Sequence, residues 1–576
     1  MIYILATNFS DLNSFTSDDE VAFMRLGDWV SSDLVSGESI DGKFKLLGNF
    51  DQIDNDIQQF YELFLSSITL ELNKLDSRKF TQKEGRIFYG PWLFHMLSHY
   101  FYLYQLLMFV KKKYKDSILV CGSENSLMSF KDTLEHKKNI RYDPYNNLVL
   151  KIIAKFIGIK FITSENYLYT WPDSEYEDHR GKYLRMAFSK IEFFINFRSK
   201  IFLKNSYINK FDRVKIFFLS IGAISTISNR PEKLNVTYNS QLRSGLNLNI
   251  KKDKSNVFID LILQNIIDEI PICFVEGFDE LQNKVKKNYK GWNPNLILSA
   301  NAWYHDEPFK LWAIFQKRNG AKLIGYQHGG VYLTYRNNFY LRHERSVTDY
   351  FLSWGLGKLK DQSIIPFYIQ KKIISPKKIK KGNRNEIMLL TNNYSKQHHF
   401  LEIFQSSYSS HIEQNCIFLE TLNPLYKVRY RPFRTDYGWK EIKDYRKINP
   451  SIELSSHKKN VLVELSLSKV VVFDNIHSTS FLESIAMNIP SIILAKDFQN
   501  EINKNTLPIF MQLKKYNILF DSGKECADFL NKNYFNIEEW WFSIPIQNLV
   551  EEFKSHFAPI SKNFSKSFIK ELSKIQ

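Results

Sequence analysis

One stretch constrains the fold more than any other part of the chain: 470–494, which reads VVVFDNIHSTSFLESIAMNIPSIIL. It holds two apolar runs, 470–473 and 491–494, with a polar turn and a helix-like segment between them. Strand, loop, helix and strand in this order predict a βαβ unit, because parallel strands need a crossover connection and are buried on both faces. The chain around this stretch should therefore be an α/β protein with parallel sheets.

The polar turn of this unit is a candidate anion site. It lies at the carboxyl end of a strand and the start of a helix, where free N–H groups and the helix dipole favour phosphate. Ser478, Thr479 and Ser480 add hydroxyl groups, and Glu483 is placed to hold ribose hydroxyls. A second interpretation stays open, because Ser480 and Glu483 also have the S-x-x-E spacing of a helix capping box.

The length of 576 residues exceeds what one core supports, so at least two domains are expected. A Lys-rich segment separates two halves that each alternate strands and helices. We predict an N-terminal Rossmann-like domain with helical insertions, a basic linker, a C-terminal Rossmann-like domain and a helical tail. Their bounds are 1–370, 371–385, 386–535 and 536–576. This layout is typical of glycosyltransferases with two Rossmann domains.

Some local predictions bear on the fold. Gly90-Pro91 places a proline in the first turn of a long helix. The ranges 184–194 and 198–204 are predicted to be helical, and 214–218 is predicted to be a short strand.

A second candidate site follows the predicted strand 322–326. Gln327, His328, Gly329 and Gly330 come directly after it. The glycines let the backbone approach a ligand closely, and His328 can act as a general base or donate to a phosphate. The alternative is a histidine in a tight turn.

A third candidate, NAWYHDEPF, also follows a predicted strand. Asp306 and Glu307 offer a carboxylate base in the same crevice as His328 if the two strands are neighbours. Ordinary capping of a helix that starts near Pro308 explains the same pattern, so both interpretations stay open.

The fourth candidate is YKVRYRPF in the C-terminal half. Arg429 and Arg431 stand two apart on a predicted strand and therefore face the same side. Paired guanidinium groups suit a pyrophosphate or an acidic sugar. Solvated arginines on an exposed edge strand are the alternative.

Charge and motif content narrow the classes of partner. The formal charge of +17 suits nucleic acid, an anionic membrane or acidic substrates. We expect no nucleic-acid partner, because no arginine-rich arm, RNA-binding signature or zinc-finger spacing occurs. We also expect no bound metal: His95 and His99 have i, i+4 spacing but no HExxH glutamate. With no basic segment before the first apolar run and no stretch of about 20 apolar residues, the chain is predicted to be cytoplasmic.

Several pieces of the chain resemble a family of transferases encoded in O-antigen and other surface-polysaccharide loci. These pieces are LGDWV, FYGPWL, SANAWYHDEPFKLWAIFQKRNGAKLIGYQHGG, HERSVTDYFLSWG, YRPF and DNIHSTSFLESIAMNIPSIIL. QHG after a strand and STS…E…P are also similar to capsule Kdo transferases and to CDP-glycerol glycerophosphotransferases of the GT-B type.

The resemblance implies a GT-B-like α/β fold: two Rossmann-like domains whose parallel sheets face an interdomain cleft, with a helical C-terminal tail. It implies that the C-terminal domain binds a cytidine-activated donor without a metal and that the N-terminal domain binds the acceptor. His328 would be catalytic or bind the donor phosphate. Contacts to the nucleotide would come from Ser478, Thr479, Ser480 and Glu483.

The hypothesis is a metal-independent glycosyltransferase of O-antigen or capsule synthesis, peripheral at the inner face of the cytoplasmic membrane. The donor would be a nucleotide-activated sugar, such as a CMP-nonulosonate or Kdo-like donor, and the acceptor a lipid-linked glycan or lipopolysaccharide. His328 is the first candidate base, followed by Asp306 and Glu307. The donor-binding set would be Gln327, Gly329, Gly330, Arg429, Arg431, Ser478, Thr479, Ser480 and Glu483. A CDP-polyol phosphotransferase and a non-catalytic polysaccharide-binding scaffold remain the alternatives.

Overall fold

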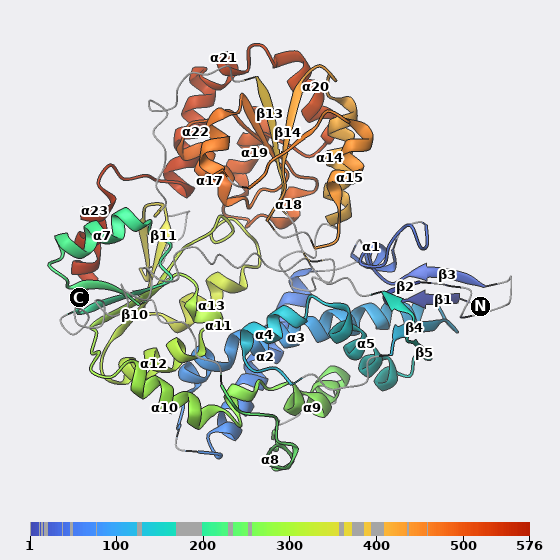
Figure 1. Cartoon of the computed structure of the whole chain (residues 1–576), viewed down its shortest axis with the longest axis vertical. Helices are drawn as coiled ribbons and strands as arrows, with labels where there is room; N and C mark the ends of the chain where they lie inside the picture. Colours follow the sequence, from blue (N-terminus) through green and yellow to red (C-terminus); the bar gives the residue numbers. More distant parts are fainter. Residues whose placement is uncertain are drawn as a thin grey trace.

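The computed structural model describes residues 2–575 in three parallel sheets with helices around them (Figure 1). The gaps in this description are 11, 13–14, 16–20, 37–38, 46–49, 77, 124–128, 169–198, 228–233, 251–255, 356–361, 371–384, 393–394, 396–407, 435–436 and 458. The predicted helix at 184–194 lies outside the described residues. So does the predicted linker, apart from Asn385.

The first sheet belongs to the N-terminal part of the chain and has the strand order β3-β1-β4-β5. Its strands are β1 (Ile2–Leu5), β3 (Ala22–Arg25), β4 (Ile118–Gly122) and β5 (Phe161–Ser164). A short antiparallel pair, β2 (Asn8–Phe9) and β6 (Tyr167–Leu168), lies beside it. Its helices are α1 (Ile40–Lys45), α2 (Phe50–Leu72), α3 (Gln82–Lys113), α4 (Thr133–Asn139) and α5 (Asp143–Ile157).

Helix α3 corrects the prediction that Pro91 lies in a first turn. The helix begins at Gln82, because Thr81 and Glu84 form a capping box that satisfies the first free N–H groups. Pro91 lies well inside the helix. A proline there removes one backbone hydrogen bond, and the 32-residue helix continues through it.

The middle sheet has six parallel strands in the order β12-β11-β10-β9-β7-β8. They are β7 (Ile201–Lys204), β8 (Ile224–Ile227), β9 (Leu296–Ser299), β10 (Lys322–Tyr326), β11 (Tyr350–Trp354) and β12 (Ile364–Phe367). The helices are α7 (Lys210–Leu219), α8 (Ser240–Ser244), α9 (Val257–Glu269), α10 (Phe278–Asn288), α11 (Ala302–His305), α12 (Glu307–Arg318) and α13 (Phe339–Val347), with a 3-10 turn at Ile272–Phe274.

Two local predictions in this sheet are wrong. Residues 201–204, predicted as part of a helix, form the buried strand β7, and 214–218, predicted as a strand, lie within helix α7. A short apolar run does not distinguish a buried strand from a helix by its periodicity, and here the pairing with β8 and β9 decides.

The C-terminal sheet has the order β15-β14-β13-β16-β17-β18. Its strands are β13 (Glu386–Leu390), β14 (Lys427–Arg431), β15 (Glu453–Leu454), β16 (Val470–Phe473), β17 (Ser491–Leu494) and β18 (Leu519–Phe520). Its helices are α14 (Tyr408–Thr421), α15 (Glu441–Ile448), α16 (Val461–Leu467), α17 (Thr479–Ala486), α18 (Phe498–Glu501), α19 (Leu507–Lys515) and α20 (Gly523–Asn533). The predicted βαβ unit is confirmed: β16 and β17 are adjacent, parallel and joined by α17.

The predicted helical tail is also confirmed, and it connects both halves. It comprises α21 (Ile537–Trp541), α22 (Ile544–Phe557) and α23 (Phe564–Ile575). Helix α22 packs on α17 of the C-terminal domain. Helix α23 returns to the middle sheet (Figure 1). There Phe568 stacks on Tyr326 with 6.1 Å between the ring centroids.

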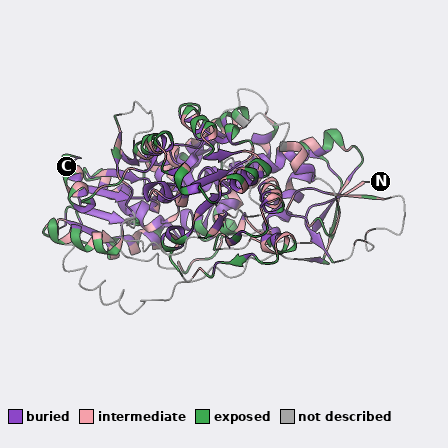
Figure 2. Cartoon of the chain, turned by 90° about the horizontal axis from the view of Figure 1, so that it is seen from above, coloured by how far each residue is buried: buried purple, intermediate pink, exposed green. Residues whose placement is uncertain are grey.

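The middle sheet shares one hydrophobic core with each of its neighbours (Figure 2). Phe202, Ile297 and Leu323 point into the core of the N-terminal part. On the opposite face, Leu203 and Ile324 belong to a core that continues into the C-terminal domain. Among the helices that the structure describes, none is long and apolar enough to cross a membrane.

Candidate active site

The strand order places a switch point in each six-stranded sheet, and ligands of α/β proteins bind outside the carboxyl ends of strands at such points. In the middle sheet the switch lies between β7 and β9, which puts residues 205–207 beside Asn301. In the C-terminal sheet it lies between β13 and β16. There the backbone N–H of Asn392 donates to Asp474 Oδ1 at 3.0 Å.

The two carboxyl edges meet at the predicted motifs. The backbone N–H of Gly330, after β10, donates to Thr479 Oγ1 at 3.0 Å. A Cβ atom at Gly330 would lie 2.6 Å from the carbonyl oxygen of His477, so only glycine fits this approach. The structure therefore brings together the QHGG loop and the turn of the βαβ unit, which are 149 residues apart in sequence.

Helix α17 begins two residues earlier than the predicted capping box requires. Its N-cap is Ser478, whose hydroxyl accepts from the backbone N–H of Phe481 at 3.3 Å. The predicted capping box of Ser480 and Glu483 is therefore wrong. Ser480 is half-buried in the first turn, and Glu483 is buried one turn further, at 1% exposure.

His328 is held in one orientation by a hydrogen-bond chain. Tyr332 OH lies 2.8 Å from His328 Nδ1 and donates its proton to Glu344 Oε1, also at 2.8 Å. When the phenol gives its single proton to Glu344, its bond to His328 has Nδ1–H as the donor. The lone pair of the imidazole is then on Nε2, as a general base needs.

Glu344 closes this chain from a fully buried position. Tyr304 OH donates to the same oxygen, Oε1. Burial raises the pKa of Glu344 well above its usual value, and the two tyrosine hydrogen bonds only partly oppose this. We infer that the carboxyl group of Glu344 is uncharged, so that it orients Tyr332 without placing a negative charge beside His328.

Tyr207, which follows β7, covers the ring of His328. The two rings stack with 5.2 Å between centroids and 9° between planes. Tyr207 has φ +55°, a conformation that costs a non-glycine residue about 1–3 kcal/mol and that the surrounding structure must hold in place. Asn301 Nδ2 donates to its hydroxyl at 2.7 Å, which fixes the ring at the switch point.

The sequence interpretation missed these three partners of His328. Tyr332 and Glu344 had usable signals, since Tyr332 is four residues from His328 and Glu344 stands in the HERSV motif. Tyr207 had none, because the strand before it had been predicted as helical.

Asp306 and Glu307 have structural partners. Asp306 caps α12 by accepting from the backbone N–H of Phe309 at 3.1 Å, and it pairs with Lys204 Nζ at 3.1 Å. Glu307 pairs with Lys310 Nζ at 3.3 Å. Burial is the largest single effect on the pKa of Glu307 and raises it, but Lys310, the hydrogen bonds to the carboxylate and His305 together lower the pKa below its usual value. A catalytic role for either carboxylate stays a prediction, and the geometry favours His328 as the base.

Gln327 shapes the loop from a position only 2% exposed. Its side-chain nitrogen donates to the carbonyl of Gly329 at 2.9 Å, and its side-chain oxygen accepts from the N–H of Trp354 at 2.8 Å. Both ends of the amide are thus occupied within the protein, and contact with a donor stays a prediction.

The two arginines are likewise paired within the C-terminal domain. Arg429 binds Glu386 at 2.8 Å and Glu453 at 2.8 Å. Arg431 is buried and forms an ion pair with Glu464. These carboxylates neutralise the guanidinium charges, which favours a structural role; phosphate binding by them stays a prediction.

A second histidine, unnoticed in the sequence, borders the junction. His477 Nδ1 lies 3.2 Å from Thr334 Oγ1, and His477 Nε2 lies 3.5 Å from Glu501 Oε2. Thr334 belongs to the loop after β10, and its carbonyl accepts from the N–H of Asn503 at 2.8 Å. The loops of the two domains are therefore interlocked around the candidate site.

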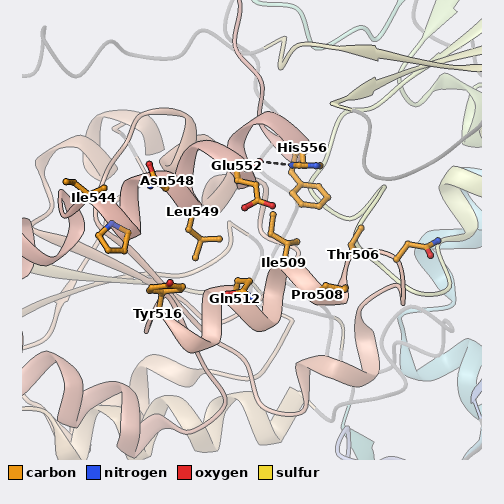
Figure 3. A pocket seen from close by; sticks show the side chains of 13 residues that line it. Thr506, Pro508, Ile509, Gln512, Tyr516, Ile544, Asn548, Leu549, Glu552 and His556 are labelled. Atoms are coloured by element: carbon orange, nitrogen blue, oxygen red, sulfur yellow. Dashed lines mark hydrogen bonds between the residues drawn. The ribbon is translucent and has the colours of Figure 1, made fainter.

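Two further features lie apart from this junction. A cavity of about 580 Å³ opens between α19 and α22, and no predicted site residue lines it (Figure 3). In the described part of the chain, no group of three or more His, Cys, Asp and Glu side chains is placed to hold a metal ion.

Comparison with known proteins gives a family. A family model described as LIC12162 family transferase matches residues 19–572. No curated protein matches the chain.

Solved structures give only distant similarity. MurG of Acinetobacter baumannii is 7% identical with a TM-score of 0.35, over 65% of this chain and 99% of that one. MnaA of S. aureus, solved with UDP, is 10% identical with a TM-score of 0.38, over 66% and 96%. An O-GlcNAc transferase of Thermobaculum terrenum is 10% identical with a TM-score of 0.34, over 84% and 82%.

Proposed function

The chain belongs to the LIC12162 family of transferases, and from this premise we propose that it is a glycosyltransferase using a nucleotide-activated sugar. The observation that carries the proposal is the hydrogen bond between Gly330 and Thr479, which joins a histidine-bearing loop to a helix N-terminus. A base and an anion site next to each other are what transfer of a sugar from a phosphate leaving group requires.

The donor phosphate would bind at the start of α17. Free N–H groups and the positive end of the helix dipole point there, and Thr479 and Ser480 supply hydroxyl groups. These groups stabilise the negative charge that develops on the departing phosphate. We include no metal in this mechanism, following the family resemblance.

The acceptor would be activated by His328. Nε2 takes the proton of the acceptor hydroxyl while the oxygen forms a bond to the anomeric carbon of the donor. The bond from that carbon to the phosphate oxygen breaks, and its electron pair leaves with the nucleotide. Tyr332 and Glu344 hold the imidazole in the required tautomer and take no part in the bond changes.

The finer identity of the substrates rests on the resemblance and on charge. A CMP-nonulosonate or Kdo-like donor follows from the similarity of QHG and STS…E…P to enzymes that use cytidine-activated donors. The resemblance to transferases of surface-polysaccharide loci supports a lipid-linked or lipopolysaccharide acceptor, and the net charge of +17 suits an anionic inner-membrane surface.

The first experiment is a thermal-shift screen with CMP, CDP, UDP and GDP, since a ligand that binds only the folded state raises the melting temperature. We expect one nucleotide to stabilise the wild type and His328→Ala similarly. In a transfer assay, His328→Ala should lose about 10²–10⁴-fold in rate, while the control His556→Ala, on α22, keeps its activity. A phosphodiester in the product would establish a polyol-phosphate transferase instead, and glycan binding without any transfer would establish a scaffold.

A further inference from the structure

Helix α7 turns an apolar stripe toward solvent. Phe211, Val214 and Phe218, spaced three and four apart, are 77%, 55% and 71% exposed. Such spacing places them on one face of the helix, and the opposite face buries Ile216. Lys215 is exposed on the same turn of the stripe. An outward stripe of this size costs solubility and marks a contact surface.

The turn after α7 adds a strained apolar residue to this stripe. Ile221 is 94% exposed and has φ +53°. For a β-branched side chain this conformation is a genuine outlier, and a polar Asn or Gly would be easier to accommodate there. The strained backbone thus places the apolar side chain of Ile221 in solvent, where no burial compensates the cost of the strain in the isolated protein.

Helix α23 lies beside α7 (Figure 1). It adds positive charge next to the apolar stripe. Both helices cover the same face of the middle sheet, because Ile216 and Phe568 belong to the core on that face. Ser565 Oγ also donates to Asp212 Oδ1 at 2.8 Å, which fixes α23 against α7. A row of exposed lysines begins just before α23 and continues along its outward face: Lys562, Lys566, Lys570 and Lys574, of which Lys574 pairs with Glu571.

We propose that α7, the turn at Ile221 and the lysine row of α23 form a surface that docks on a membrane containing anionic phospholipids. The apolar stripe would enter the headgroup boundary while the lysines contact the lipid charges. The location suits a lipid-linked acceptor, because α7 starts three residues after Tyr207, whose ring stacks on His328. The role of this surface, holding the enzyme near a lipid-linked acceptor, rests on the proposed function. Docking on the membrane itself requires no substrate.

The test is co-sedimentation of the full-length protein with vesicles of phosphatidylcholine, with and without phosphatidylglycerol. The wild type should bind the anionic vesicles, and high salt should weaken this binding. Phe218→Ser/Ile221→Asn should weaken it about tenfold or more without lowering the melting temperature, since Asn suits the backbone of position 221. Lys566→Gln/Lys570→Gln should lower binding to the anionic vesicles only.

The matched control is Leu425→Ser/Phe535→Ser, which removes two side chains that are 86% and 80% exposed on the C-terminal domain. It should bind vesicles like the wild type. The proposal is overturned if the wild type does not bind, if Phe218→Ser/Ile221→Asn binds normally, or if the control loses binding equally. A wild-type dimer that Phe218→Ser/Ile221→Asn converts to a monomer without changing vesicle binding would identify a protein contact instead. Vesicle binding by a protein that transfers nothing would support the surface and count against the proposed function alone.

Discussion

The backbone N–H of Gly330 and the hydroxyl of Thr479 are joined by a 3.0 Å hydrogen bond that links the loop after β10 to the first residue of α17. Each partner follows the carboxyl end of a strand in a different sheet. The bond thus sets the distance between a base on one sheet and an anion site on the other, and substitutions at it should affect both.

Gly330→Ala is expected to disturb this junction, because the added Cβ atom would lie 2.6 Å from the carbonyl oxygen of His477. Such overpacking costs about 1–3 kcal/mol and should lower both the melting temperature and the nucleotide-induced shift. Gly329→Ala is the matched control: its Cβ atom would meet only Thr479 Oγ1, at 3.6 Å. Equal losses in both variants would contradict the close approach.

Tyr332→Phe should lower the transfer rate by about tenfold or more, since it removes the acceptor that holds His328 Nδ1–H and thereby the lone pair on Nε2. Its effect should appear in kcat more than in KM, because the side chain does not touch substrate.

Glu344→Gln should keep most of the activity. Burial raises the pKa of Glu344 and so favours its uncharged form, and a glutamine oxygen can accept from Tyr332 as the carboxyl does. The transfer rate of the wild type and of Glu344→Gln, measured as a function of pH, tests whether Glu344 is uncharged. A large loss in Glu344→Gln with a shifted profile would show that Glu344 works as an anion.

The regular C-terminal half was predictable because its signals agree. In 470–494 the β-branched runs, the polar turn and the helical spacing all indicate the same βαβ unit, which β16, α17 and β17 confirm. The strand β7 was not predictable, because IFLK suits a helix or a buried strand and only its position between β8 and β9 decides. Tyr207 follows this strand and was therefore not predicted to be a site residue.

The site was predictable only as separate motifs. QHGG and the Ser-Thr-Ser turn at 478–480 were each predicted as candidate sites, but their contact depends on how the two sheets pack, which no local pattern encodes. The arginine pair shows the reverse case. Spacing indicated two free guanidinium groups on one face, while the partners Glu386 and Glu464 come from other elements of the domain.

These ion pairs predict different costs for the two arginines. Arg431→Ala should lower the free energy of unfolding by about 3–5 kcal/mol, because it leaves the buried carboxylate of Glu464 without its cation. Arg429→Ala should cost about 0–1 kcal/mol, since its partner Glu453 is largely exposed. Denaturant unfolding measures both. If Arg429→Ala instead leaves stability unchanged and abolishes the nucleotide-induced shift, Arg429 binds the donor as first predicted.

Acid should destabilise the protein through the histidine His99. Burial alone lowers the pKa of this residue from 6.5 to about 3, and its ring stacks on Tyr145 inside the N-terminal core. Below pH 6.5 the unfolded chain therefore binds a proton that the folded chain does not. Stability from this group is fully present above pH 6.5 and is lost as the pH falls toward 3.

Between pH 7 and pH 5 this loss amounts to about 2 kcal/mol, which His99→Phe should remove from the pH dependence whatever it does to stability at pH 7. Urea unfolding of both proteins at the two pH values measures the difference, with His556→Phe on the surface as the control. Because His136 is buried in the same core and its pKa is likewise lowered to about 3, His99→Phe/His136→Phe should flatten the dependence further. An unchanged pH dependence in His99→Phe would mean that folding does not lower the pKa of His99, and it would contradict the prediction.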